Sequence, residues 1–241
     1  MRRVAAPLLA VLLLAGCSGA EGERAQELLS RAQTAQARVS SMGYELRMTF
    51  NLDGRRAALV LDGGAYLRGR RAGDQVMTMR MEGLPGVSAM NMSMLLQGRR
   101  MSFSVNGQQY STSVPAQSKA QYDWSSSIVE LSRYVKEVRV HEHRVVNGER
   151  GATITGVIDT EGLLKAAAKL QSLSRMSGTT TPDMSAFAEH VSDTRAALFV
   201  SGRTGLIRSA VVSVSLDAAG KKVDLDLTYR LKHVNRPIPG L

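Results

Sequence analysis

Thioether sulfur is the functional group that this sequence concentrates most. Of the 12 methionines, seven fall between residues 77 and 101. Six of them alternate along two short segments, as Met77, Met79, Met81, Met90, Met92 and Met94. Because methionine is unbranched and polarizable, it repacks around irregular apolar partners, and a wall of it suits a cavity for flexible chains. Methionines also fill ordinary cores, so both interpretations stay open.

Copper chemistry is a third interpretation of the methionines. Thioethers are soft ligands that select Cu(I), and the 90–94 segment has the spacing of a copper site if it lies in an exposed loop. Gly83, Pro85 and Gly86 precede it without adding histidine or cysteine ligands. We keep copper binding as an alternative and expect no resident cofactor.

Two histidines are predicted to share one face of a strand. His141 and His143 lie two residues apart, with Glu142 between them on the other face. A metal would need a third ligand, and the spacing places none. Arg139 and Arg144 flank the pair, so we interpret both histidines as surface residues and predict no metal site.

Recognisable catalytic motifs are absent. The sequence has no Gly-x-Ser-x-Gly elbow, no His-Glu-x-x-His, no paired cysteines and no phosphate-binding glycine loop. Asp224 and Asp226 alternate on what would be the polar face of a strand. We therefore expect the chain not to be an enzyme.

A single cysteine follows a short apolar leader. Arg2 and Arg3 precede an apolar run over residues 4–15, which is too short for the roughly 20 residues of a membrane-spanning helix and is typical of a signal peptide. Leu14-Ala15-Gly16-Cys17 resembles the lipobox of bacterial lipoproteins. The resemblance implies that lipid is attached to Cys17 and that residues 1–16 are removed.

The formal net charge is +10. Its excess is scattered arginine, which fits either a solvated surface or attraction to anionic lipid headgroups, worth on the order of 1 kcal/mol for each nearby basic residue. No aromatic and basic stacking motif accompanies it, so we expect no nucleic-acid partner.

Hydrophobic periodicity divides the rest of the chain. Residues 23–41 have the apolar spacing of an amphipathic helix, which Gly43 is predicted to end, and residues 18–22 then form a short tether. Period-two alternation follows in about nine or ten segments, with turn signals at 53–54, 106–107 and 147–148. Helical spacing returns over 124–135 and 160–190, around a polar loop at 174–182.

The whole pattern resembles the LppX/LprG envelope lipoproteins, which share the half-open barrel of the LolA and LolB carriers. The likeness is carried by the lipobox, by Val39-Ser40-Ser41 leading into the Tyr44 strand, by Asn147-Gly148 turning into Ile154-Thr155-Gly156, by the Thr160 helix and by the pattern from Leu206 to Pro239. It implies a curved sheet around helices, with an apolar cavity that holds the acyl chains of a lipid or lipoprotein.

We therefore expect one α+β domain over residues 23–241: a single strongly curved antiparallel sheet with helices packed in or over its concave face. The expected function is an anchored carrier of a lipid, glycolipid or other acylated molecule on the outer face of the cytoplasmic membrane. A structural or signalling lipoprotein with a filled core is the other alternative. The predicted cavity residues are Leu46, Met48, Phe50, Leu59, Met77, Met79, Met81, Met101, Phe103, Ile154 and Leu198.

Overall fold

A computed structural model describes residues 19–52, 55–83, 90–113, 135–159, 190–218 and 221–241. One helix precedes eleven strands in that part of the chain. In order they are α1 (Ala20–Gln36), β1 (Ser41–Leu52), β2 (Arg55–Tyr66), β3 (Gln75–Glu82), β4 (Met90–Gln97), β5 (Arg100–Val105), β6 (Gln108–Ser113), β7 (Val135–Val146), β8 (Glu149–Ile158), β9 (Val191–Ser201), β10 (Ile207–Ala218) and β11 (Lys221–Lys232).

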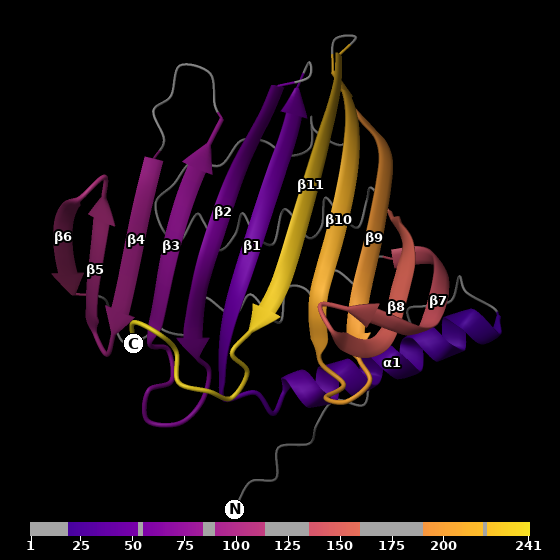
Figure 1. Cartoon of the computed structure of the whole chain (residues 1–241), viewed down its shortest axis with the longest axis horizontal. Coiled ribbons are helices and arrows are strands. Elements are labelled where there is room, and N and C mark those ends of the chain that lie inside the picture. Colours follow the sequence, from indigo (N-terminus) through magenta and orange to yellow (C-terminus); the bar gives the residue numbers. More distant parts are fainter. Residues whose placement is uncertain (1–18, 53–54, 84–89, 114–134, 160–189, 219–220) are drawn as a thin grey trace, which may run out of the picture.

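All eleven strands form one antiparallel sheet, and the first and last of them are neighbours at its centre. The strand order is β6-β5-β4-β3-β2-β1-β11-β10-β9-β8-β7, so the two edges are β6 and β7. In Figure 1 the β7–β8 hairpin bends strongly beside α1. The predicted single meander sheet is confirmed, and it has more strands than the alternation indicated.

Two hairpin turns follow directly from their sequences. Asn106-Gly107 and Asn147-Gly148 each have two consecutive residues with positive φ, at 48° and 89° in the first turn and 51° and 77° in the second. This is the pattern of a type I′ turn, whose twist matches that of the flanking strands. The turns predicted from these two dipeptides are therefore confirmed.

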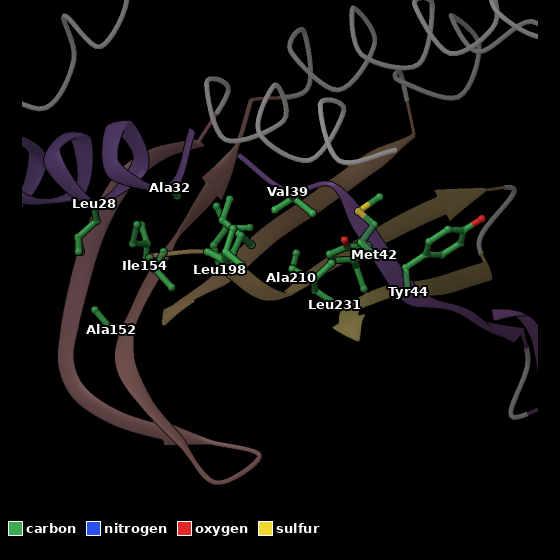
Figure 2. Packing of buried hydrophobic residues seen from close by; sticks show 14 of the residues in the cluster. Leu28, Ala32, Val39, Met42, Tyr44, Ala152, Ile154, Leu198, Ala210 and Leu231 are labelled. Carbon is green, nitrogen blue, oxygen red and sulfur yellow. The ribbon is translucent and has the colours of Figure 1, made fainter. Parts of the chain in front are cut away.

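α1 packs on one end of the sheet. Its buried residues are Ala25, Leu28 and Ala32, and they join a core cluster with residues of β1, β8, β9, β10 and β11. Figure 2 shows Leu28 and Ala32 close to Ile154 and Leu198. The helix thus seals the end of the sheet at which β1 begins.

The predicted bounds of this first helix are wrong at both ends. α1 begins at Ala20, where Glu21 and Glu23 lie in the first turn and favour a helix N-terminus, so residues 20–22 do not belong to the predicted tether. It ends at Gln36 instead of running to Ser41. Gly43 lies inside β1, opposite Gly64 and Lys232, because pairing with two strands continues through it.

The second half of the chain needs one further correction. Val135, expected at the end of a helix, is the first residue of β7 and is buried opposite Ile158. The remaining helical segments predicted over 124–134 and 160–189, the loop at 174–182 and the leader with Cys17 lie outside the described residues. No helix in the described part of the chain is both long and apolar enough to cross a membrane.

The C-terminal residues fold back over the start of β1 and the end of β2, below the sheet in Figure 1. The Asn235 backbone N–H donates to Ser41 O at 2.8 Å, and the Ser41 hydroxyl donates to Arg236 O at 2.8 Å. Ile238 is buried, and its N–H donates to the Tyr66 hydroxyl at 3.3 Å. The tail is therefore a packed part of the domain.

Candidate functional site

One face of the sheet carries an apolar surface that continues from strand to strand. Residues directly opposite each other in an antiparallel pair project to the same face. Leu46 of β1 lies opposite Leu61 of β2 and Tyr229 of β11, and Met48 lies opposite Leu59 and Leu227. Between them, the other residues of β1 are polar, such as Arg47 and Thr49. We call the side of the sheet that carries Leu46 the apolar face.

Six methionines form a two-strand array on the apolar face. The register between β3 and β4 places Met77 opposite Met94, Met79 opposite Met92, and Met81 opposite Met90. The array continues the apolar surface of β2, because Met79 lies opposite Leu61 and Met81 opposite Leu59. All six side chains are partly exposed. Strand alternation thus gathers the flexible thioethers on one side of the sheet.

Aromatic and further apolar residues extend this surface to the β6 edge. Phe103 of β5 lies opposite Met94 of β4 and Tyr110 of β6. The Phe103 and Tyr110 rings stack, with centroids 5.1 Å apart and planes inclined by 16°. Met101 lies opposite Leu96 of β4. The apolar surface therefore reaches the last strand on this side.

On the other side of β1 the apolar face merges with the packed core. Leu198 of β9 lies opposite Ala210 of β10 and Ile154 of β8. Ile154 and Leu198 are 2% and 4% exposed and belong to the cluster beneath α1. The apolar face thus has a sealed part under α1 and a partly exposed part over β1 to β5.

The register places all eleven predicted cavity residues on this one face. Ile154 and Leu198 lie in the sealed part, where they contact the chain's own core. The other nine lie in the partly exposed part, as Leu46, Met48, Phe50, Leu59, Met77, Met79, Met81, Met101 and Phe103. That these side chains contact a ligand stays a prediction.

Sequence reasoning left several members of the face out of the site. Leu225 and Leu227 of β11 lie opposite Phe50 and Met48, and Leu61 lies opposite Leu46. Their alternation was visible, but alternation does not reveal that the last strand pairs with the first. Tyr110 was missed because all six residues of β6 are exposed and show no apolar alternation.

The opposite face, which we call the polar face, carries a group of ionised side chains, together with the buried apolar residues Ala58 and Val60. The Lys232 ammonium donates to Glu45 Oε2 and Asp62 Oδ2, each at 2.7 Å. Burial alone would lower the pKa of Lys232, but the hydrogen bonds to the two carboxylates outweigh it and raise that pKa. These cross-strand bonds connect β11, β1 and β2, the three central strands.

Tyr44 is the most strongly perturbed acid in the described part of the chain. Burial, with a smaller contribution from the negative charge of Asp62, raises the pKa of Tyr44 to about 12. Its ring lies beside Gly63, the residue opposite it on β2. A Cβ at Gly63 would come within 3.0 Å of the Tyr44 hydroxyl and 2.5 Å of Val76 O, so glycine makes room for the ring.

The histidine pair does not have the simple geometry expected of it. The β7–β8 register shifts between His141 and Arg144, and His143 has φ of 56°, so strict alternation does not hold there. Both histidines are exposed, and His141 Nε2 lies 3.2 Å from Thr155 Oγ1. Among the described residues, no three His, Cys, Asp or Glu side chains cluster as a metal site would require.

No known family and no curated protein sequence matches the chain. The crystal structure of LprF from Mycobacterium bovis does match, with a TM-score of 0.55 and 13% identity over 91% of this chain and 96% of LprF. The chain has the fold of LprF.

Other solved structures superimpose less closely on this LprF-like fold. The lipoprotein LppX from Mycobacterium tuberculosis has a TM-score of 0.47 and 14% identity, over 89% of this chain and 97% of LppX. A LolA superfamily protein from Nitrosomonas europaea has a TM-score of 0.25 and 9% identity, over 86% of this chain and 93% of its own. The match to LprF confirms, for the fold, the resemblance expected from the sequence.

Proposed function

We propose that this protein is a lipid-anchored envelope protein that binds and carries a lipid, glycolipid or other acylated molecule on its apolar face. The observation that carries the proposal is the apolar surface over β1 to β5. Its side chains are partly exposed because α1 does not cover this part of the sheet. Large apolar surfaces on a monomeric protein usually mark a binding site. The LprF-like fold and the lipobox at 14–17 support the same function.

The chemistry of the face suits acyl chains. Its partly exposed side chains between β2 and β5 are aliphatic, aromatic or thioether, and the polar Gln75 on the same face is buried, so recognition there depends on burial of hydrocarbon. Each buried CH₂ group contributes about 0.8 kcal/mol, and a long chain is held without any directional bond. Methionine side chains adapt to chains of different shape, so we propose that selectivity for a particular headgroup lies elsewhere.

The Met79→Arg variant tests this function. Met79 lies in the middle of the array, opposite Leu61 and Met92, where a guanidinium would have to lose its water for an acyl chain to bind. We expect the variant to lose bound lipid when it is purified gently from native membranes and its lipid extract is analysed by mass spectrometry. A fluorescent fatty acid should bind at least tenfold more weakly.

Thr78→Arg is the matched control. Thr78 is the adjacent, exposed residue of β3 and projects to the polar face, so this variant adds the same charge to the same strand. It should keep its lipid, and both variants should unfold at similar temperatures. Equal lipid content in wild type and Met79→Arg, or no lipid in either, would contradict the proposal and favour a structural role.

Copper binding remains the second candidate because of the methionine array. Three cross-strand methionine pairs place many soft ligands together. The 90–94 segment, however, lies in β4 and not in the exposed loop that the copper interpretation required. Elemental analysis of the same lipid-bearing preparation separates the two functions: we expect no stoichiometric copper, and retention of one Cu(I) per chain would favour the alternative.

A further inference from the structure

A hollow lies at the α1 end of the sheet, apart from the partly exposed methionine array. It is a cleft of about 1100 Å³ between α1, the β7–β8 turn and the β9–β10 turn. Four arginines line it, one pair from the helix and one from the two hairpins: Arg24, Arg31, Arg150 and Arg203. We call this hollow the arginine cleft.

The two carboxylates of the arginine cleft are already neutralised. Glu142 Oε1 accepts a hydrogen bond from Arg24 Nε at 2.7 Å, and Glu149 Oε2 accepts one from Arg208 Nε at 3.0 Å. By contrast, Arg31, Arg150 and Arg203 are exposed and form no ion pair with any residue that the structure describes. Three positive charges in the cleft therefore lack a counter-ion among the described residues.

Hydrogen bonds and close packing fix the backbone around these arginines. Gly202 N–H donates to Arg150 O at 3.0 Å, which joins the β9–β10 turn to β8, and Ser201 Oγ donates to Glu149. Gly205 has φ of 71°, and a Cβ placed there would lie 3.5 Å from Ala35 Cβ. The turn thus packs closely against α1. Helix and hairpins hold the arginines at one site instead of on independent loops.

The cleft is also close to the proposed anchor. Cys17 precedes Ala20, the first residue of α1, by three residues, which span at most about 11 Å. Arg24 lies about 6 Å further along the helix axis. A bilayer that holds the lipid on Cys17 therefore brings its phosphate groups within reach of the cleft.

We infer that the arginine cleft binds the phosphate headgroups of anionic phospholipids in the membrane to which the chain is anchored. Guanidinium groups match phosphate oxygens in charge and in bidentate geometry. Binding there orients the α1 end of the sheet toward the bilayer. This inference rests on the proposed anchoring at Cys17, although its test does not require lipidation.

The test uses the mature chain from position 17 onward with Cys17→Ser, so that no attached lipid contributes. It should sediment with vesicles of equal parts phosphatidylcholine and phosphatidylglycerol, and not with phosphatidylcholine alone. The triple variant Arg31→Gln, Arg150→Gln and Arg203→Gln should bind about a hundredfold more weakly, since each basic residue near an anionic bilayer contributes about fivefold. Added salt should weaken wild-type binding.

The control variant removes the same charge elsewhere. Arg47, Arg80 and Arg139 are exposed on the polar face, and their replacement by glutamine should reduce binding much less. Equal losses in both triple variants would show attraction by net charge and overturn the site. Wild-type binding to both vesicle types would also overturn it. So would inorganic phosphate that competes for the arginine cleft as strongly as the anionic vesicles do. Thermal unfolding verifies that each variant folds.

Discussion

Tyr44 shows how one buried acid makes stability depend on pH. Its folded pKa of about 12 lies above the value of about 10 for an unfolded chain. Between those values the folded state binds more protons than the unfolded state, so the free energy of unfolding falls as pH rises. The contribution of Tyr44 to the free energy of unfolding amounts to about 2–3 kcal/mol. It is fully present below about pH 10 and is lost by about pH 12.

We expect Tyr44→Phe to remove this dependence. Phenolate absorbance of the wild type should show a titration step near pH 12, and the variant should lack that step. Urea unfolding at pH 9 and pH 11.5 should show a smaller loss of stability in the variant than in the wild type. A wild-type spectrum in which every tyrosine titrates near pH 10 would contradict the assignment.

Single residues were predictable where alternation alone decided their side. Met77, Met79 and Met81 share a face because successive strand residues point to opposite sides. The same rule failed at His143, since a bulge in β7 gives that residue positive φ. Nothing in its sequence marks a bulge there. The exposure of individual side chains could not be predicted from the sequence either. Ile154 and Met79 both occupy apolar positions in alternating segments, but only Ile154 lies beneath α1.

Helices and strands with strong turn signals or regular apolar spacing could be predicted from the sequence. Elements that lack these signals could not. β5 and β7 end in Asn-Gly turns, and both were expected. β6 was missed because its six residues are polar or exposed and it forms an edge of the sheet. The start of α1 was misplaced because Ala20 and Gly22 carry no apolar spacing, while the acidic residues beside them favour the helix.

The C-terminal tail provides a test at the level of elements. Ile238 is 4% exposed and packs on Gly64, where a Cβ would meet its Cγ2 at 2.5 Å. Ile238→Ala should lower the free energy of unfolding by about 2–5 kcal/mol, measured by urea denaturation. Val145→Ala, at a residue that is 62% exposed, should change it by about 0.5 kcal/mol or less. Equal effects would mean that the tail does not contribute to the core.

For the whole molecule, the sequence indicated one large antiparallel sheet but not its strand order. Alternation and turns define local hairpins, and no local signal specifies that β11 pairs with β1. That pairing places the methionine array, the leucines of β1 and those of β11 on one continuous surface. The candidate site is therefore a property of the topology as much as of its residues.

The proposed anchoring at Cys17 can be tested on the whole molecule. Cys17→Ser should move the protein from the membrane fraction to the soluble fraction and abolish labelling by radioactive palmitate, because the thiol is the proposed attachment point. Ser18→Ala, which keeps the cysteine, should remain labelled and membrane-bound. A Cys17→Ser protein that stays in the membrane fraction would show that another segment provides the attachment.

Under the proposed export, the central pairing of β1 with β11 also determines when the sheet can be completed. Lys232 and Glu45, which join across it, are 187 residues apart in the chain. An exported chain emerges N-terminus first, so β1 cannot pair with β11 until almost the whole chain has crossed the membrane. Until then its leucines and methionines are exposed to other chains, and an envelope chaperone that shields them would act on this protein before any cargo does.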